Sequence, residues 1–302
     1  MPEQPFRSGY VSIIGRPNVG KSTLINLIVG KKIAIISDKP QTTRNRILGI
    51  KTLPEAQVIF IDTPGIHKPP KLMNKVMVKI ALQAMSDMDA IIFVTEIKRK
   101  THPQDLFILK SLGRVKCPVV LAINKCDLLP QYPEMNIQQM TENYQSLLSF
   151  NGIFHISALT NTNVDSLLDR VVGLLPEGPM YYPEDTVTDL SEEFILAEII
   201  REKALLLTRQ ELPYSTGVLV ESIEEDDREE ETLVVIHATI YVERPSQKAI
   251  VIGKGGQMLK NIGTQARKEM EAIFGLRVFL KLFVKVKEKW TENAMILKRM
   301  GL

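Results

Sequence analysis

The chain has 302 residues, of which 44% are hydrophobic and 24% charged, and its formal net charge is +3. This composition is typical of a soluble globular protein, and the length favours two domains. No apolar run approaches the roughly eighteen residues of a membrane helix, and the N-terminus has no apolar signal core, so we expect a cytoplasmic protein without a transmembrane segment. The two cysteines, Cys117 and Cys126, predict neither a metal cluster nor a disulfide framework.

The first part of the chain alternates strand-like and helical patterns. Apolar runs at 10–15 and 57–62 predict strands, a helix follows from about Lys21, and residues 73–85 have the apolar spacing of another helix. Three further strand-like runs read DAIIFVTE, PVVLAINK and IFHISA. This alternation predicts an α/β fold with a doubly wound, mostly parallel sheet, whose ligand-binding loops lie at the carboxyl ends of the strands.

Residues 176–190 contain three prolines and no hydrophobic period, which predicts a linker between a domain at 1–175 and a second at 191–302. After the linker, Ser191 is a predicted cap for a long helix. Two strand patterns, two helices separated by glycines and a further strand follow, with a last helix in KWTENAMILKRM. The second domain is therefore predicted to be a smaller α+β domain with the order α-β-β-α-α-β.

The segment GRPNVGKS, Gly15–Ser22, fits the pattern G-x-x-x-x-G-K-[ST] and lies between a strand and a helix. Backbone N–H groups of such a loop close around phosphates, Lys21 reaches the β and γ phosphates, and Ser22 ligates Mg²⁺. Asp62 ends the next strong strand and is placed to hold the magnesium through water. In DTPG, Gly65 lets a backbone N–H approach the γ-phosphate, although the same four residues are also good turn chemistry.

The segment NKCD, Asn124–Asp127, follows the strand VVLAI. A carboxylate at Asp127 accepts hydrogen bonds from the N1–H and 2-amino groups of guanine, which adenine lacks. In the later ISAL segment, the N–H of Ala158 is placed to contact the guanine O6. The predicted nucleotide contacts are Gly15, Arg16, Pro17, Asn18, Val19, Gly20, Lys21, Ser22, Thr23, Asp62, Thr63, Pro64, Gly65, Asn124, Lys125, Asp127, Ser157, Ala158 and Leu159.

This ordered set resembles the translation-factor-like GTPases over residues 8–175. The resemblance implies a GTPase that binds GTP and GDP with Mg²⁺. We expect hydrolysis by the protein alone to be slow, because no strong water-orienting side chain is visible. It also implies that Thr43 of KPQTTRNRI, or alternatively Thr42, contacts Mg²⁺ and the γ-phosphate. The expected metal ligands are Ser22, Thr43 and, through water, Asp62, and the expected catalytic groups are Lys21, Thr43, Gly65 and Asn18.

The residue after DTPG is Ile66, which can neither orient nor deprotonate the attacking water. His67 titrates near neutrality, but a loop histidine is commonly structural. Arg44 or Arg46 can supply positive charge, or simply be solvated. In GTPases that this chain resembles, an asparagine at the place of Asn18 helps to hold K⁺, which neutralises charge in the transition state; the alternative is an asparagine chosen for loop geometry.

Charge is distributed unevenly in the second domain. Residues 221–231 carry eight acids and one arginine, whereas the chain from Arg244 onward has thirteen Lys or Arg against four Glu. This basic surplus indicates either a polyanionic partner or a solvated surface.

The segment VIGKGG, Val251–Gly256, joins two helices, and its place in the α-β-β-α-α-β order resembles a type II KH domain over about 190–290, with a helix hairpin as the alternative. The resemblance implies that Lys254 lies near RNA phosphates and that the adjoining helix and strand form a groove for bases. Trp290 is expected to pack under the last helix or to stack on a base. The expected RNA contacts are Ile252, Gly253, Lys254, Gly255, Gly256, Lys260, Lys281 and Lys285.

A GTPase domain followed by a KH domain resembles a family of bacterial GTPases over essentially the whole chain. That resemblance implies binding of the 3′ end of 16S rRNA, a role in assembling the small ribosomal subunit and loose association with the inner membrane; we expect a monomer. Three alternatives remain: a GTPase coupled to RNA modification, an RNA-binding module whose nucleotide is a structural ligand with little turnover, and a regulator at the membrane surface.

Overall fold

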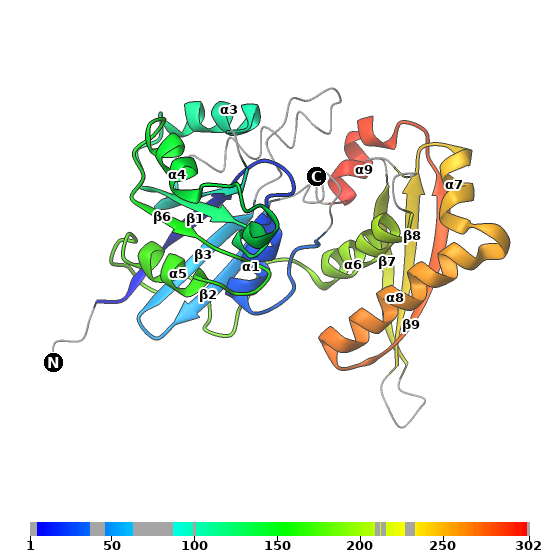
Figure 1. Cartoon of the computed structure of the whole chain (residues 1–302). Coiled ribbons are helices and arrows are strands. Elements are labelled where there is room, and N and C mark those ends of the chain that lie inside the picture. Colours follow the sequence, from blue (N-terminus) through cyan, green and yellow to red (C-terminus); the bar gives the residue numbers. More distant parts are fainter. Residues whose placement is uncertain are drawn as a thin grey trace. The chain divides into compact units, whose positions relative to one another are not determined.

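The structure is a computed structural model that describes residues 5–36, 46–62, 87–98, 101–208, 212, 216–226 and 233–300. The chain divides into two compact units, the first formed mainly by residues up to Asp189 and the second mainly by Leu190–Leu302 (Figure 1).

The described part of the first unit is built on a six-stranded sheet with the order β2-β3-β1-β4-β5-β6. All neighbouring strands pair in parallel except β2, which is antiparallel to β3. The fold is therefore the predicted doubly wound, mostly parallel sheet, with one antiparallel edge strand that was not predicted. The strands are β1 Arg7–Ile14, β2 Ile47–Leu53, β3 Ala56–Asp62, β4 Ala90–Glu96, β5 Val119–Asn124 and β6 Gly152–His155.

Helices cover both faces of this sheet (Figure 1). On one face, α3 and α4 pack against β1, β4 and β5 in a continuous apolar core, where the rings of Phe93 and Tyr144 meet edge to face. On the other face lie α1 and α5. The helices are α1 Lys21–Val29, α3 Pro103–Leu112, α4 Ile137–Gln145 and α5 Val164–Val172, with a 3₁₀ helix at Cys126–Gln131. The helix predicted at 73–85 lies outside the described residues.

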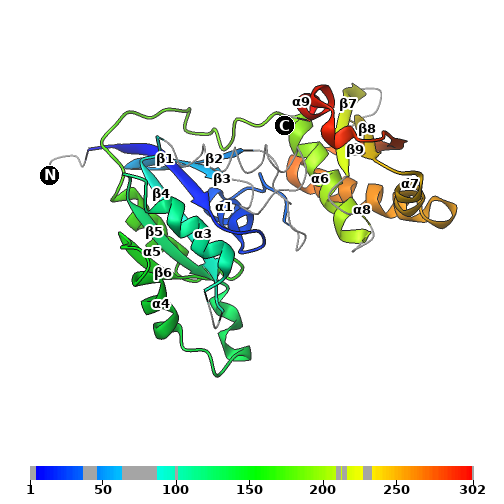
Figure 2. The same ribbon diagram turned by 90° about the horizontal axis from the view of Figure 1, so that it is seen from above.

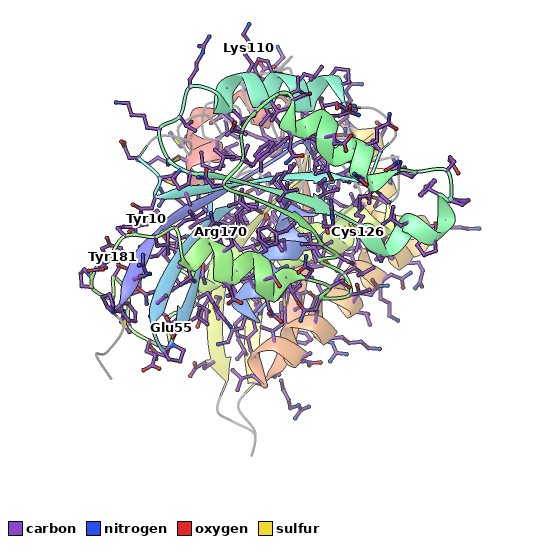
Figure 3. All side chains as sticks on the ribbon, turned by 60° about the vertical axis from the view of Figure 1, so that its left-hand side comes forward. Tyr10, Glu55, Lys110, Cys126, Arg170 and Tyr181 are labelled. Atoms are coloured by element: carbon purple, nitrogen blue, oxygen red, sulfur yellow. The ribbon has the colours of Figure 1, made fainter. Side chains whose placement is uncertain are left out.

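Of the predicted linker at 176–190, residues 176–189 belong to the first unit and form hydrogen bonds with its sheet. The side chain of Gln57, fully buried on β3, accepts hydrogen bonds from the backbone N–H groups of Tyr181 and Tyr182 at 2.8 and 3.0 Å and donates one to the carbonyl of Tyr182 at 2.9 Å. The ring of Tyr181 lies 5.6 Å from that of Tyr10 (Figure 3). This proline-rich stretch therefore has a fixed path along the first unit.

The described part of the second unit has the predicted order α-β-β-α-α-β. The backbone N–H of Phe194 lies 3.4 Å from the hydroxyl of Ser191, which caps the first helix as expected. The helices α6, α7 and α8 pack on one face of a sheet with the order β7-β8-β9, where β7 is antiparallel and β9 parallel to β8 (Figure 2). The elements are α6 Glu192–Leu207, β7 Gly217–Asp226, β8 Leu233–Val242, α7 Pro245–Ile252, α8 Gln257–Phe274 and β9 Arg277–Val286.

The chain then forms a 3₁₀ helix at Trp290–Glu292 and a short helix, α9 Ala294–Arg299. Trp290 is completely buried. A Cβ atom on Gly217 of β7 would lie only 2.8 Å from its indole ring, so the ring packs directly on the backbone of the sheet. Of the two expectations for Trp290, packing is the one that the structure supports, since a buried ring has no face for a base.

Candidate functional site

The loop from β1 to α1 is shaped by two glycines. A Cβ on Gly15 would lie 2.3 Å from the carbonyl oxygen of Val94, so a side chain there would collide with β4. Gly20 has φ 97°, the left-handed conformation that glycine adopts most easily, and begins α1. The ammonium of the buried Lys21 donates to the carbonyl of Arg16 at 3.2 Å, and burial lowers its pKa while the Asp62 carboxylate opposes that shift. The loop therefore holds the ammonium of Lys21 buried at the start of α1.

Ser22 and Asp62 meet beside Lys21. The Ser22 hydroxyl donates to Oδ2 of Asp62 at 2.8 Å, and Asp62 is fully buried at the end of β3. A hydroxyl and a carboxylate are hard oxygen ligands of the kind that Mg²⁺ prefers, and their approach within hydrogen-bond distance fits a magnesium held by Ser22 directly and by Asp62 through water. Among the described residues, no group of three or more His, Cys, Asp or Glu could hold a metal ion.

Asn124, at the end of β5, ties three loops together. Its side-chain amide donates to the carbonyl of Val19 at 2.8 Å, and its amide oxygen accepts from the backbone N–H of Ala158 at 2.9 Å. A Cβ on Gly20 would lie 2.3 Å from the Asn124 amide nitrogen, so this contact requires glycine. The first residue of NKCD thus joins the phosphate loop to the ISAL loop.

Lys125 and Glu96 make a second connection. The ammonium of Lys125 donates to the carbonyl of Asn18 at 2.7 Å and to Glu96 at 2.5 Å, while Arg16 binds the other oxygen of the same carboxylate at 2.8 Å. Burial pushes the pKa of Glu96 upward, but hydrogen bonds from Lys125, Arg16 and Lys98 outweigh it and lower the pKa to about 2. Glu96 was not predicted; the sequence signal for it is its position at the carboxyl end of β4, where the loops of the site gather.

The residues predicted to recognise guanine lie close together. The Ser157 hydroxyl donates to Oδ1 of Asp127 at 2.6 Å, which orients the carboxylate. Ala158 is buried, whereas Leu159 is 78% exposed. The loop between β1 and α1 contains Arg16, Pro17, Asn18 and Val19, and the first turn of α1 contains Thr23. Arg46 precedes β2. The predicted residues Thr42, Thr43, Arg44, Thr63, Pro64, Gly65, Ile66 and His67 lie outside the described part of the chain.

In the second unit, the loop between α7 and α8 presents its backbone to solvent. Gly253, Gly255 and Gly256 have φ values of 71°, 58° and 80°, and a Cβ on Gly255 or Gly256 would meet no atom within 4 Å. Lys254 and Gly255 are exposed. The loop needs glycine for its left-handed backbone, and the space above it is open to a ligand.

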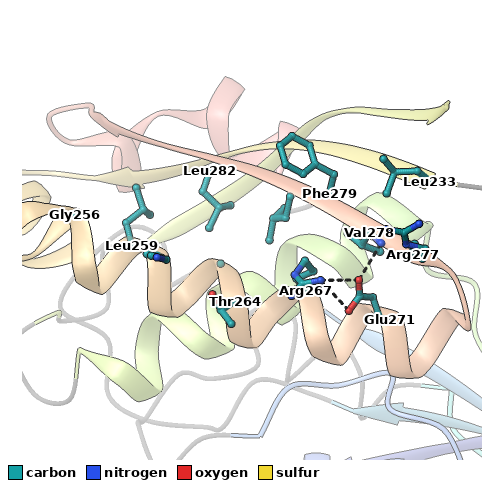
Figure 4. A pocket seen from close by; sticks show the side chains of 13 residues that line it. Leu233, Gly256, Leu259, Thr264, Arg267, Glu271, Arg277, Val278, Phe279 and Leu282 are labelled. Carbon is teal, nitrogen blue, oxygen red and sulfur yellow. Dashed lines mark hydrogen bonds and ion pairs between the residues drawn. The ribbon is translucent and has the colours of Figure 1, made fainter. Parts of the chain in front are cut away.

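From Gly256 a groove of about 690 Å³ follows α8 and the edge strand β9 (Figure 4). Arg267 pairs with Glu271 at 3.0 Å, and Glu271 accepts from the backbone N–H of Val278 at 3.2 Å, so one end of the groove is braced across helix and strand. The lining residues are Leu233, Gly256, Leu259, Lys260, Gly263, Thr264, Arg267, Glu271, Arg277, Val278, Phe279, Leu280 and Leu282.

The structure separates the predicted RNA residues. Residues 252–256 and Lys260 lie at or beside the groove, but Lys281 and Lys285 do not line it. Arg267 and Arg277 line the groove and were not predicted. The sequence signal for the wall of the groove formed by α8 is a spacing of three or four residues, which puts side chains on one helix face. The residues with this spacing are Lys260, Thr264, Arg267 and Glu271.

Among the described helices, none combines the length and apolar character needed to cross a bilayer. Cys117 and Cys126 carry free thiols.

Comparisons with known proteins match both units. The family model of the 50S ribosome-binding GTPase matches residues 10–125, and that of the KH domain matches residues 211–291. The chain is 51% identical over 301 residues to GTPase Era of Geotalea daltonii, covering 100% of this chain and 99% of the relative. A solved structure of an Aquifex aeolicus Era variant bound to GDP·AlF₄⁻ is 40% identical with a TM-score of 0.91, covering 98% of this chain and 99% of that one. A structure of Era in complex with MgGDPNP and nucleotides 1506–1542 of 16S ribosomal RNA is also 40% identical, with a TM-score of 0.90 and the same coverage.

Proposed function

This chain belongs to the GTPase Era family and is a GTPase with a KH domain, and we propose that it is a GTP-dependent switch that binds the 3′ end of 16S rRNA during assembly of the small ribosomal subunit. The observation that carries the proposal is an open glycine loop at the mouth of a basic groove, in a chain that also holds a guanine-nucleotide site. A solved Era structure contains both MgGDPNP and this region of rRNA.

In the nucleotide site, the guanine and phosphate halves are joined by this chain's own side chains. Asp127 accepts from the guanine edge, and Asn124 and Lys125 hold the carbonyls of the phosphate loop. Lys21 stabilises charge on the β and γ phosphates. A magnesium ion between Ser22 and Asp62 would neutralise phosphate charge when bound. We propose Thr43 and Gly65 for the γ-phosphate side of the site, as expected from the sequence.

The residue after DTPG, Ile66, cannot orient the attacking water. We propose that a potassium ion near Asn18 stabilises the transition state instead. Asn18 is exposed with φ 65°, and its backbone carbonyl already accepts from Lys125. We propose that its side-chain oxygen helps to hold the cation, whose charge would offset the charge that develops in the transition state. With Ile66 as the residue after DTPG, turnover by the protein alone is expected to be slow.

In the RNA site, the glycine loop admits the sugar–phosphate backbone and Lys254 and Lys260 neutralise phosphates, while the groove takes unstacked bases. A KH groove of this kind clamps about four nucleotides. In the described sheet β9 is an edge strand, so backbone groups along its outer edge can pair with base edges. The protein is proposed to act in the cytoplasm as a monomer, with loose association at the inner membrane.

The experiment that tests the RNA proposal compares two matched glycines. Gly255→Asp places a carboxylate in the loop, whereas Gly275→Asp introduces the same residue at the other end of α8, where φ is also positive and the Cβ also meets nothing within 4 Å. Like charges near phosphates cost several kcal/mol, so Gly255→Asp should weaken binding of the 3′-terminal 16S rRNA segment by about tenfold or more.

Gly275→Asp should leave this affinity nearly unchanged. Equal affinities of both variants for the rRNA segment would remove the loop from the RNA site. Crosslinking of the GTP-bound and GDP-bound wild-type protein to cellular RNA provides the second readout, and a lack of 16S rRNA enrichment in both states would remove the assembly role.

A further inference from the structure

A strip of alternating aromatic and basic residues lies on the face of the KH sheet that is turned away from α8. Along β9, the apolar residues at even numbers belong to the core beneath the helices, whereas Phe279, Lys281, Phe283 and Lys285 alternate with them and are exposed. Phe279 is 50% exposed and Phe283 51%. We call these four residues the outer strip.

Exposed apolar side chains that gather on one face, rimmed by polar residues, mark interaction sites in proteins. Between the rings, the ammonium of Lys281 lies 5.6 Å from the centroid of Phe279 and 3.4 Å from Nε2 of His237, on the neighbouring strand. Phe279 and Phe283 are four residues apart, about 13 Å along the strand, which is far enough for the two rings to contact different bases. This arrangement matches how proteins bind single-stranded nucleic acid, with bases stacked on rings and phosphates held by lysines.

The outer strip is continuous with the groove. Leu280 and Leu282 line the groove from the inner side of β9, whereas Phe279 lines it from the outer side; Figure 4 shows Phe279 and Leu282 on opposite sides of the strand. A strand of RNA that leaves the groove therefore passes around the free edge of β9 directly onto the strip.

Charge confines the path of such a strand to β9. The backbone of β7 lies about 10 Å from that of β9, across two strand spacings, and on the same face β7 carries Glu221 and Glu224. Glu221 accepts from Thr239 at 2.9 Å and lies 3.4 Å from the ammonium of Lys285. The acidic strand repels phosphates on one side of the strip, and the pairing of Lys285 leaves Lys281 as the principal phosphate contact.

We propose that the outer strip is a second site for single-stranded RNA, which takes the nucleotides that follow those in the groove. This inference rests on the proposed function. The rRNA segment in the solved Era complex spans 37 nucleotides, counting both ends, far more than the roughly four that a KH groove clamps. A second site on the same domain gives the excess RNA a surface, and tethered binding at both sites raises the affinity for long RNA only.

The test measures the affinity of the full-length protein for two RNAs by fluorescence anisotropy. One RNA has the 37 nucleotides of that rRNA segment, and the other has about six, just longer than the groove holds. The variants are Phe283→Ala and Lys281→Gln, neither of which lines the groove. The control is Phe107→Ala on α3, an exposed phenylalanine (53%) in the first unit.

Phe283→Ala should weaken binding of the long RNA by about fivefold or more, as expected for the loss of one base stack, and should leave the short RNA unchanged. Lys281→Gln should reduce the slope of log Kd against log salt concentration by about 0.7 for the long RNA, the value for one phosphate contact on a single strand. Because Lys281 is exposed, this second variant tests the site independently of packing.

Three outcomes would overturn the inference. The first is a long-RNA affinity of Phe283→Ala equal to that of Phe107→Ala, together with an unchanged salt slope for Lys281→Gln. The second is an equal loss of affinity for both RNAs, and the third is that the variants lose affinity only for vesicles of phosphatidylcholine and phosphatidylglycerol. The last outcome would make the strip a membrane contact. Failure of the wild-type protein to bind either RNA would instead reject the proposed function.

Discussion

At the residue scale, Glu96 binds Arg16 of the phosphate loop and Lys125 of the NKCD segment through its two carboxylate oxygens, and so adds a charged connection between these loops. Replacing Glu96 by Gln keeps its shape and removes its charge. Loss of one charge-assisted hydrogen bond costs about 1.5 kcal/mol or more, so Glu96→Gln should weaken GDP binding by roughly tenfold in a nucleotide titration. The matched control is Glu142→Gln on the exposed side of α4. An unchanged GDP affinity for Glu96→Gln would show that the two loops hold their positions without this carboxylate.

The same carboxylate makes a prediction for pH. The folded-state pKa of Glu96, about 2, lies below its ordinary value of 4.5. A group with a depressed folded pKa contributes stability that is fully present above the unfolded pKa and is lost as the pH falls toward the folded pKa. The difference in free energy of unfolding between the wild-type protein and Glu96→Gln should therefore be constant above about pH 5.5 and shrink between pH 4.5 and 2. Denaturant titrations across this range measure it, and a difference that grows on acidification would contradict the assignment.

Asn18 carries the proposal for potassium. Wild-type protein should hydrolyse GTP faster in potassium than in sodium buffer, and loss of the side-chain amide in Asn18→Ala should make the two rates equal. Asn18 has φ 65°, so alanine there also strains the backbone. Asn18→Gly removes the same amide without that strain and should behave alike. A potassium effect that survives in Asn18→Gly would place the cation elsewhere, and equal rates of the wild-type protein in the two buffers would reject it.

The residues that sequence predicted best are those whose roles follow from local order along the chain. GRPNVGKS lies between β1 and α1, and NKCD begins at the end of β5, as the order of patterns along the chain predicts. Glu96 could not be found in this way, because its role depends on β4 lying beside β5 and the phosphate loop, a contact between distant segments.

At the element scale, the segment 176–189 adds an ordered edge to the first unit. The backbone N–H of Ile50 on β2 donates to the carbonyl of Val187 at 2.9 Å, and Gln57 binds the backbone at Tyr181 and Tyr182. Gln57→Leu has a similar volume but loses these hydrogen bonds, so we expect it to lower the free energy of unfolding by about 2 kcal/mol. It should also speed proteolytic cleavage within 176–189.

Gln104→Leu, at the start of α3, is the control for an added apolar side chain. Cleavage of Gln57→Leu at the wild-type rate would mean that the other contacts of the segment are sufficient to hold it. This path could not be predicted from the sequence, because three prolines without a hydrophobic period are typical of linkers whether or not they pack on a domain.

The strand patterns were informative where strands are buried in the middle of the sheet. β1, β3, β4 and β5 have continuous apolar runs and were predicted. β2 was missed because ILGIKTL shows neither a continuous apolar run nor clear alternation; its signal is the two-residue turn at Pro54 and Glu55 that joins it to β3. Lys281 and Lys285 were assigned to the RNA groove because alternation identifies an exposed face but not which binding surface that face serves.

At the scale of the whole molecule, the GTPase and the RNA-binding unit are proposed to be coupled, and thermodynamic linkage makes this quantitative. If replacing GDP by GDPNP changes RNA affinity by some factor, RNA must change the relative affinity for GDPNP and GDP by the same factor. Isothermal titrations of full-length protein measure both sides of this cycle. Gly255→Asp should abolish the effect of RNA on nucleotide affinity at RNA concentrations that saturate the wild-type protein. Identical RNA affinity in both nucleotide states would show that the nucleotide is a structural ligand.

The contact between Gly20 and Asn124 also limits how this protein can vary. The amide of Asn124 occupies the place of any side chain at position 20, so neither position can change alone without a collision or a lost hydrogen bond. A library aimed at new nucleotide preferences therefore has to randomise the two codons jointly. Screens that change one position at a time would classify both as immutable, even if a different pair of residues fits the same space.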